Sequence, residues 1–230
     1  MANTILITGA NRGIGLALAR AAAARGDRVI ATARRPGEAA DLAEMARGTD
    51  GVETRGLDVT RPDEVEGLAE TIRTPVDIVV CNAGQFVARG GIDDPAYTAE
   101  AWESVLMTNV AGPFFTVRAF LGHLERAPVP RVAVISSIMA SSARAPGGAY
   151  IYRASKAAAT NLARNLAQDL APRGIAVGAY HPGWVRTDMG GAGADLGVEE
   201  SAAGLLARFD ALTLETSGTF EDHEGAPISF

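Results

Sequence analysis

The amino-acid sequence predicts an α/β protein, built as a single doubly wound parallel sheet with helices on both faces. Short apolar runs alternate along the chain with helical patterns, which is typical of parallel strands joined by helices. Glycine-rich or polar residues follow several of these runs, where sheets of this kind place their ligand sites. The 230 residues suffice for one domain with a substantial core, and no linker, repeat or low-complexity tract divides residues 1–230.

Composition and charge exclude several other classes. The net charge is −6 without a long basic run, so we expect no nucleic-acid partner. No apolar run approaches the roughly 20 residues that cross a bilayer, and the N-terminus lacks a signal-peptide pattern, so we expect no membrane association. The single cysteine, Cys81, excludes an intramolecular disulfide and agrees with a cytoplasmic location. The three histidines are scattered, so we expect no metal site.

A glycine-rich turn lies between the first strand and the first helix. Ile5–Ile7 predicts a buried strand, and Ile14–Ala24 predicts a helix. The spacing between them is G-x-x-x-G-x-G, and glycines before a helix N-terminus let the backbone approach a pyrophosphate. The alternative is a tight turn without a ligand. The predicted phosphate-binding residues are Gly9, Asn11, Arg12, Gly13, Ile14 and Gly15.

The end of the second strand, Arg28–Ala33, indicates which dinucleotide binds. In a Rossmann-type sheet, an acidic residue here holds the 2′-hydroxyl of the adenosine ribose, whereas an arginine accommodates a 2′-phosphate. Ala33 has no carboxylate, while Arg34 and Arg12 carry positive charge. We therefore predict NADP(H) in preference to NAD(H). The alternative is that Arg34 is only a solvated loop charge, which leaves NAD(H) open.

The third strand, Val52–Leu57, follows a weak helix over Ala39–Arg47. Asp58 and Val59 come directly after this strand, and we expect them to contact the adenine through a carboxylate and an apolar side chain. A second interpretation is that Asp58 and Thr60 begin the next helix, because Thr60 and the acidic residues after it resemble a capping pattern. Both interpretations can hold together.

Small residues follow the fourth strand, Val76–Val80, and a polar residue interrupts the helix beyond it. Asn82-Ala83-Gly84 would let a cofactor lie against the backbone. We expect a loop over residues 86–98 and then a helical pattern from Ala99 onward. Asn109 interrupts this pattern, and its amide would bond to the interrupted backbone or hold a water.

The fifth strand, Arg131–Ile135, leads to the residues that carry the predicted chemistry. Ser136 and Ser137 follow it, and a loop over 138–149 then reaches Tyr152 and Lys156, before a helix expected from Ala154 to about Leu170. Residues four apart on a helix share a face. A neighbouring ammonium lowers the pKa of a phenol, so this pair can exchange a proton with a substrate oxygen.

Lysine usage singles out the same pair. Of the 21 basic residues, 20 are arginines, and Lys156 is the single lysine. A compact ammonium differs chemically from a flat guanidinium, so the exception suggests a special role. The alternative is that Tyr152 is a half-buried aromatic residue and Lys156 a solvated surface charge.

Three further elements complete the predicted fold. Ile175–Tyr180 predicts a sixth strand, Val198–Phe209 a final helix and Ser217–Phe220 a short last strand. A loop over residues 181–188 follows the sixth strand, at the same edge of the sheet as the other candidate residues.

Together these motifs resemble the short-chain dehydrogenase/reductase family from end to end. The segments around Tyr152 and over residues 181–189 look most similar to its carbonyl-reductase-like branch, which includes sniffer and C-signal. The matching stretches are Thr8 to Gly15, Asp58-Val59, Asn82-Ala83-Gly84, Asn109, Ser136-Ser137, Tyr152 to Lys156 and Pro182-Gly183.

The resemblance implies an NADP-dependent oxidoreductase that transfers a hydride between nicotinamide and a small carbonyl or alcohol substrate. Tyr152 would be the general acid or base, and Lys156 would lower its pKa and bind the nicotinamide ribose. Ser137 would polarise the substrate carbonyl. Ser136 is the alternative, because the gap between Ser137 and Tyr152 exceeds the family's usual one. Asn109 would hold a water of a proton relay.

The loop after the sixth strand has implied roles as well. Thr187 and the backbone near Val185 would fix the nicotinamide carboxamide, in the loop that begins with Pro182 and Gly183. A substrate lid would lie near 188–198, and its short glycine-rich sequence suggests an open or mobile pocket. Three aromatic residues are candidate pocket residues, although core packing is the expected role for each of them: Trp184, Tyr97 and Phe86.

The resemblance also bears on assembly and on function class. The family usually pairs the helices near 109–126 and 154–170 between subunits, so we expect a homodimer or homotetramer. A competing hypothesis is a cofactor-binding signalling or regulatory protein with vestigial dehydrogenase activity. The intact set of Asn109, Ser137, Tyr152 and Lys156 argues against it, because a binding module does not need all four.

Overall fold

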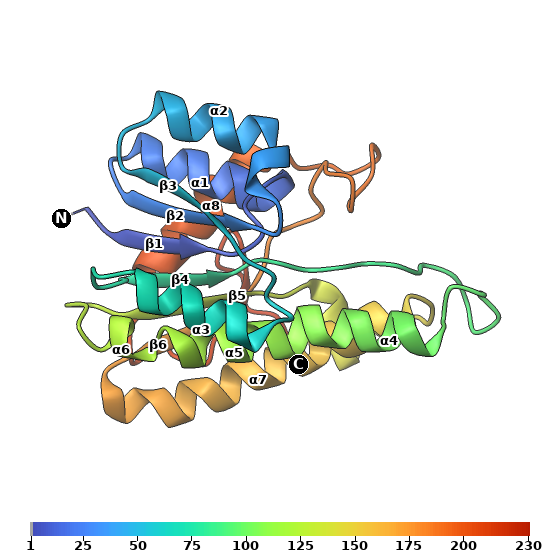
Figure 1. The fold of residues 1–230 in the computed structure, drawn as a ribbon. Helices are drawn as coiled ribbons and strands as arrows, with labels where there is room; N and C mark the ends of the chain where they lie inside the picture. Colours follow the sequence, from blue (N-terminus) through green and yellow to red (C-terminus); the bar gives the residue numbers. More distant parts are fainter. Residues whose placement is uncertain (1) are drawn as a thin grey trace.

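A seven-stranded parallel sheet forms the centre of the computed structural model, which describes residues 2–230 (Figure 1). Its strand order is β3-β2-β1-β4-β5-β6-β7, and every neighbouring pair is parallel. The predicted doubly wound parallel sheet is therefore confirmed. The strands are β1 (Thr4–Ile7), β2 (Arg28–Ala33), β3 (Val52–Gly56), β4 (Ile78–Cys81), β5 (Arg131–Ile135), β6 (Ala176–His181) and β7 (Phe220–Asp222).

Helices cover both faces of the sheet (Figure 1). One face packs against α1 (Gly13–Ala24), α2 (Ala40–Gly48) and α8 (Val198–Ala211). The other face packs against α3 (Pro62–Thr71), α5 (Gly112–Ala119) and α7 (Tyr150–Leu170), with α4 (Ala99–Leu106) and α6 (Leu121–Leu124) on the same side. A π-helical turn (Met107–Ala111) joins α4 to α5, and short 3-10 turns lie at Pro36–Glu38, Ile138–Ala140, Ser142–Arg144 and Ala171–Arg173.

The strands are apolar on both faces because helices bury both. In β1, Ile5 and Ile7 belong to the core beneath α1 and α8, while Leu6 belongs to the core beneath α3, α5 and α7. Successive side chains of a strand point to opposite faces, so a short run of consecutive apolar residues supplies both cores. This explains why the central strands lack the polar–apolar alternation of a half-exposed sheet.

Two elements begin three or four residues away from the start that the sequence predicts. α7 begins at Tyr150, so Tyr152 lies in its first turn instead of ahead of the helix. Aromatic and β-branched residues are weak helix formers, and here packing in the tertiary structure outweighs that preference. β7 begins at Phe220, because Ser217 instead accepts a hydrogen bond from the Val177 N–H through its side chain.

The strand order reverses between β1 and β4. After β3 the chain returns to the other side of β1 and continues outward through β5 and β6. In open α/β sheets, ligands bind beyond the carboxyl ends of the strands at such a point. The glycine-rich turn after β1 and the Asn82 segment after β4 lie at this position.

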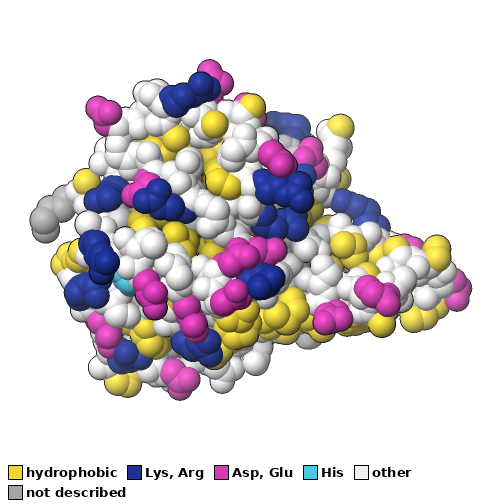
Figure 2. Space-filling model, viewed as in Figure 1, with side chains coloured by type: hydrophobic (Ala, Val, Ile, Leu, Met, Phe, Trp, Pro, Cys, Tyr) yellow, Lys and Arg dark blue, Asp and Glu magenta, His cyan; other side chains and the backbone are white. Residues whose placement is uncertain are grey.

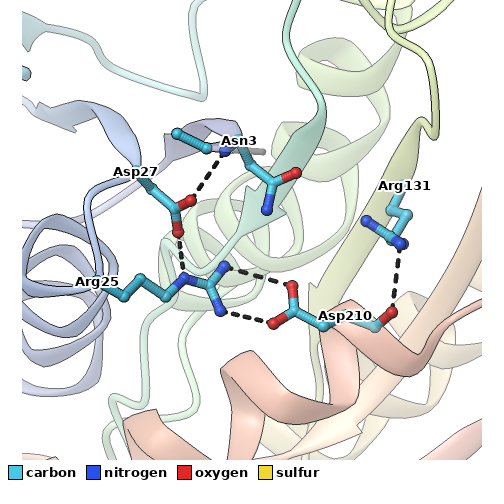
Figure 3. Close-up of a pocket in the computed structure, with 6 residues that line it drawn as sticks. Asn3, Arg25, Asp27, Arg131 and Asp210 are labelled. Atoms are coloured by element: carbon cyan, nitrogen blue, oxygen red, sulfur yellow. Dashed lines mark hydrogen bonds and ion pairs between the residues drawn. The ribbon is translucent and has the colours of Figure 1, made fainter.

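The opposite edge of the sheet carries a hollow of about 560 Å³ that is lined by charged residues (Figure 3). Arg25 forms ion pairs with Asp27 and Asp210, and Asp27 also accepts a hydrogen bond from the Asn3 N–H at 2.9 Å. Arg131 donates to the backbone oxygens of Asp210 and Leu212. These groups satisfy one another, so the network ties α1, α8 and β5 together and leaves no free charge aimed at a ligand.

Candidate active site

The glycine-rich turn after β1 has the backbone geometry of a phosphate-binding site. Gly9 and Gly13 have φ values of 67° and 53°, in the region that favours glycine. A Cβ atom added to Gly15 would lie 2.2 Å from the Gly9 carbonyl oxygen, so only glycine fits. No side chain caps the N-terminus of α1, and its first turn contains no acidic residue. The first N–H groups of the helix are therefore available to an anion.

Hydrogen bonds join the end of β1 to the end of β4. The Thr8 hydroxyl accepts hydrogen bonds from the backbone N–H groups of Asn82 and Ala83, at 3.0 and 3.1 Å. The Asn82 amide donates to the carbonyl oxygens of Thr8 and Gly9, at 2.9 and 3.0 Å. This tie fixes the position of the glycine-rich turn relative to Asn82-Ala83-Gly84.

The residues expected to contact the adenosine end up at the carboxyl ends of β2 and β3. Ala33 is buried and Arg34 is exposed, so the end of β2 offers a positive charge and no carboxylate. Asp58 accepts hydrogen bonds from the Thr60 N–H and hydroxyl, at 2.9 and 2.8 Å. Val59 is buried, and a Cβ atom at Gly112 would lie 2.9 Å from its side chain.

The interpretation of Thr60 as a helix cap is wrong. α3 begins at Pro62 after Arg61, whose side chain forms no capping hydrogen bond. Proline is favourable in the first helical turn because it has no N–H to satisfy, so the helix begins there without a polar cap. The acidic residues act on the preceding turn instead, since the Glu64 carboxylate accepts from the Asp58 N–H at 3.0 Å.

Arg12 contacts the loop after β6. Its guanidinium forms an ion pair with the Asp188 carboxylate at 2.5 Å, and both side chains are exposed. Thr187, the residue before Asp188, packs against the same turn, because a Cβ atom at Gly13 would lie 3.3 Å from its methyl group. The predicted phosphate loop and the predicted lid therefore touch.

Asn109 lies in the π-helical turn that joins α4 to α5, at the point where the sequence pattern is interrupted. The side chain is buried, and its Oδ1 accepts from the Gln85 N–H at 2.8 Å. Its Nδ2 donates to the Gln85 carbonyl oxygen and to the Ser155 hydroxyl, at 3.0 and 2.9 Å. The amide thus bonds to the backbone of a different segment and not to its own helix. π-helical turns are frequent at functional sites.

Tyr152 and Lys156 lie in the first two turns of α7, and both side chains are buried. The Lys156 ammonium donates to the Ile135 carbonyl oxygen at 2.7 Å and lies 5.7 Å from the centroid of the Tyr152 ring. A Cβ atom at Gly84 would lie 3.4 Å from Asn109 Oδ1 and 3.6 Å from Lys156 Nζ. Gly84 therefore leaves open the space that these two polar atoms face.

The two serines after β5 point in different directions. The Ser136 hydroxyl is buried against α7, where it bonds to the Thr160 hydroxyl and the Lys156 carbonyl oxygen, at 2.5 and 3.3 Å. Ser137 accepts from the Met139 N–H at 3.1 Å, and its hydroxyl lies close enough to the Tyr152 phenol to lower the pKa of that group. Of the two serines, Ser137 is therefore the one placed beside the phenol.

Burial moves both pKa values away from a phenolate–ammonium pair. It raises the pKa of Tyr152 to about 12, although the hydrogen bond with Ser137 and the charge of Arg89 act in the opposite direction. It lowers the pKa of Lys156 to about 8. The structure thus differs from the expectation that Lys156 lowers the pKa of Tyr152, because loss of water outweighs the effect of neighbouring charges.

Phe86 and Arg89 extend the site beyond the residues that the sequence singles out. The rings of Phe86 and Tyr152 stack at 4.1 Å between centroids with an interplanar angle of 11°. The Arg89 guanidinium lies 4.3 Å from the centroid of the Phe86 ring. The expectation of core packing for Phe86 is therefore wrong, because the ring covers the phenol. No spacing in the sequence identifies Arg89, because the contact depends on the path of the loop between β4 and α4.

The segment after β6 is organised by its own hydrogen bonds. Val185 and Leu196 form a parallel bridge, and the Arg186 guanidinium donates to the carbonyl oxygens of Ala194 and Asp195, at 3.1 and 2.6 Å. The Gly190 N–H donates to the Thr187 hydroxyl at 3.0 Å. These contacts offset part of the entropic cost of ordering glycines, and the expectation of an open or mobile pocket stays a prediction.

Other residues of this segment take up defined positions. Pro182 is buried and its carbonyl oxygen accepts from the Ser201 hydroxyl at 2.6 Å. Gly183 has a φ of 87°, and a Cβ atom there would lie 2.6 Å from the Leu196 side chain. Trp184 is 56% exposed, so the expectation that it packs in the core is wrong.

The described residues show neither a metal cluster nor a membrane helix. Within residues 2–230, no three side chains among His, Cys, Asp and Glu are grouped as a metal site would require. None of the helices in this part of the chain combines the length and the apolar character that crossing a bilayer requires.

The fold and this arrangement of side chains define a class of oxidoreductases. The model of the short chain dehydrogenase family matches residues 3–195. The chain therefore belongs to the short-chain dehydrogenase/reductase family, as its motifs predict.

Similar proteins specify the branch. The chain is 39% identical to C-signal of Myxococcus xanthus over 155 aligned residues. This alignment covers 67% of this chain and 92% of C-signal. The NADPH-bound carbonyl reductase from chicken fatty liver is 30% identical with a TM-score of 0.92, over 100% of this chain and 99% of that one. Carbonyl reductase Sniffer of D. melanogaster is 28% identical with a TM-score of 0.92, over 100% of both chains. The predicted carbonyl-reductase-like branch is confirmed.

The depressed pKa of Lys156 predicts a pH-dependent stability. Between about pH 8 and pH 10, the unfolded chain keeps its lysine protonated while the folded protein releases that proton. Because the unfolded state binds more protons, the contribution of Lys156 to the free energy of unfolding rises with pH, by up to about 1.4 kcal/mol per pH unit. Urea unfolding at about pH 8 and pH 9.5 should show wild type gaining on Lys156→Met as pH rises. A stability difference that stays constant with pH would contradict the depressed pKa.

Proposed function

We propose that this protein is an NADP(H)-dependent reductase of aldehydes or ketones, which also catalyses the reverse oxidation of alcohols. The observation that carries the proposal is the placement of the Ser137 hydroxyl and of Lys156, the single lysine of the chain, beside the Tyr152 phenol. Reduction of a carbonyl is helped by a proton donor and a second hydroxyl group that donate to the same substrate oxygen. The carbonyl reductases among the similar structures support the same reaction.

The residues around the switch point fit a dinucleotide phosphate. The open N-terminus of α1 and the glycines before it accept a pyrophosphate, with Asn11, Arg12 and Ile14 alongside. Arg34 would meet the 2′-phosphate, while Asp58 and Val59 would contact the adenine. When bound, NADPH supplies the hydride. The remaining cofactor-binding residues are Asn82, Ala83, Gly84, Tyr152, Lys156, Pro182, Gly183, Val185 and Thr187.

In the reductive direction, Tyr152 donates its phenolic proton to the substrate oxygen as negative charge develops there. Ser137 donates a hydrogen bond to the same oxygen and polarises the carbonyl beforehand. Lys156 would hold the nicotinamide ribose, and it stabilises the phenolate that remains. Asn109, which fixes the Gln85 backbone and faces the space beside Gly84, holds the water through which Tyr152 regains its proton.

We further infer one domain with a substrate lid formed by residues 188–198. Two contacts support this inference: Arg12 forms an ion pair with Asp188, and Arg89 donates a hydrogen bond to the Met189 carbonyl oxygen. A lid held in this way excludes water from the reacting atoms. The single buried thiol, Cys81, is compatible with a reducing cytoplasm, where we place the protein.

The apolar surface of the helical layer supports a homodimer or homotetramer. Figure 2 shows hydrophobic side chains gathered along the lower edge of the molecule, where α4 and α5 meet. Leu106 and Phe114 are 37% and 39% exposed there, although both are large apolar side chains. Exposed apolar patches of this kind mark interaction surfaces. Light scattering should give a mass of at least two chains, and a single-chain mass would contradict the proposal.

Substitution of Tyr152 by phenylalanine tests the proposed reaction. The variant keeps the ring that stacks on Phe86 and loses only the proton donor. We expect NADPH-dependent reduction of benzaldehyde to fall by about 10²–10⁴-fold while NADPH affinity stays unchanged. Stopped assays of alcohol formation together with fluorescence titration of NADPH provide the two readouts. Retention of most of the activity would contradict a general-acid role for Tyr152.

Substitution of Arg34 by alanine tests the preference for NADP(H). Loss of a charge-assisted contact with the 2′-phosphate should weaken NADPH binding by about 10–100-fold, with little change for NADH. Fluorescence titration with both nucleotides measures the two affinities. Arg47→Ala is the matched control, because Arg47 is an exposed arginine that bonds to the Ala43 carbonyl oxygen within its own helix. Equal losses for both nucleotides, or none for either, would refute the assignment.

A further inference from the structure

A stack of charged and aromatic groups covers Tyr152. The Arg89 guanidinium lies 4.3 Å from the centroid of the Phe86 ring, and the Phe86 ring lies 4.1 Å from that of Tyr152. The Lys156 ammonium lies 5.7 Å from the Tyr152 centroid. Two nearly parallel rings therefore have a cation near each of them. Arg89 and Phe86 come from the loop between β4 and α4, while the other two residues come from α7.

The geometry of the ring pair requires an explanation. Aromatic rings carry negative charge on their faces, so nearly parallel stacking is less favourable than an edge-to-face arrangement unless the rings are offset. A guanidinium over one ring attracts that negative face and favours the flat arrangement. Arginine suits this position better than lysine, since its planar group stacks on a ring while its other N–H groups remain free to donate.

Arg89 is held in this position by a second contact. It donates a hydrogen bond to the Met189 carbonyl oxygen in the segment after β6. Two cations lie near the Tyr152 ring, Arg89 in the loop after β4 and Lys156 in α7, and the neutral Ser137 hydroxyl approaches the phenol from the segment after β5. The Phe86 ring fills the space between Arg89 and Tyr152, so water is excluded along that line, while the exposed guanidinium remains screened on its outer side.

We propose that Arg89 is a positioning residue for proton transfer at Tyr152, which acts by holding Phe86 flat against the phenol ring and by supplying a second positive charge beside the phenolate. This inference rests on the proposed function for its catalytic meaning. In the reductive step, the O–H bond of Tyr152 breaks, its proton joins the substrate oxygen, and the electron pair stays on the phenolic oxygen. Arg89 therefore stabilises the state after proton transfer more than the state before it.

Fluorine NMR of the protein labelled with fluorotyrosine tests this coupling without cofactor or substrate. Comparison with Tyr152→Phe assigns the resonance of Tyr152 among the four tyrosines. In Arg89→Leu, the pH midpoint of that resonance should rise by about half a pH unit, as expected for a unit charge at roughly 10 Å through a partly screened path. Arg89→Lys should restore part of the shift, because it keeps the charge and loses the flat contact.

Two further variants identify the route of the effect. Arg126→Leu removes an exposed arginine that bonds only to the Gly122 carbonyl oxygen of its own helix, and it should leave the midpoint unchanged. In a Phe86→Leu background, removal of Arg89 should shift the midpoint by less than it does in the wild type. The proposal is overturned by an unchanged midpoint in Arg89→Leu, by an equal shift in Arg126→Leu, or by the same shift with and without Phe86.

A kinetic measurement separates this inference from the proposed function. In oxidation of benzyl alcohol with NADP⁺, the rate rises with pH as the phenolate forms, and Arg89→Leu should move that limb to higher pH with NADP⁺ affinity unchanged. Absence of turnover in the wild type would count against the proposed function alone, since the NMR midpoint decides the coupling independently. Turnover with an unmoved pH limb, but a higher KM for the alcohol, would instead make Arg89 a simple substrate contact and would overturn the proposal.

Discussion

The hydrogen bonds between Thr8 and Asn82 are the constraint on which the rest of the site depends. They join the carboxyl ends of two neighbouring strands, β1 and β4, at the point where the strand order reverses. Each strand continues into a different half of the site: β1 into the glycine-rich turn, and β4 into Gly84 and the loop that carries Phe86. Because both partners are backbone and short side chains, the tie has little freedom to vary. It sets the distance between the proposed phosphate-binding turn and the Tyr152 phenol.

Burial then determines the protonation states that the chemistry begins from. Tyr152 and Lys156 are held in a region from which water is largely removed, so the pKa of each group shifts toward its neutral form; at neutral pH Tyr152 is a neutral phenol, while Lys156, with a pKa of about 8, still carries its proton. A neutral phenol is the form that donates a proton, which suits a reductase in its resting state. Ser137 and Arg89 lower the pKa of Tyr152, against the effect of burial, and both stabilise the negative charge once it appears on the phenol. The site thus favours the acid before the transfer and supplies partners for its conjugate base afterwards.

The sequence predicts the elements more accurately than the contacts between them. Buried parallel strands such as β5 are identified within a residue, because consecutive apolar residues bounded by polar ones have few other interpretations. The interruption at Asn109 is also visible, although its π-helical form and its bonds to Gln85 are not. The start of α7 is missed because Tyr150 and Ile151 favour the helix only through packing. The Phe86–Arg89 stack has no local signal at all, since the two residues meet Tyr152 through a loop with no regular structure.

The uneven use of basic residues follows from the same physical distinction. The arginines of the site make contacts that use the planar, multiply donating guanidinium: Arg186 donates to two carbonyl oxygens, Arg12 pairs with a carboxylate and Arg89 stacks on a ring. A guanidinium is always charged in proteins, so at a buried position without a carboxylate it would impose the full cost of an unpaired charge. Lys156 occupies such a position, with a carbonyl oxygen as its hydrogen-bond partner, and only an ammonium can release a proton there at an accessible pH. The single lysine therefore stands at a buried position where the side chain has to be able to gain and lose its proton. Its positive charge becomes favourable when Tyr152 turns into a negatively charged phenolate.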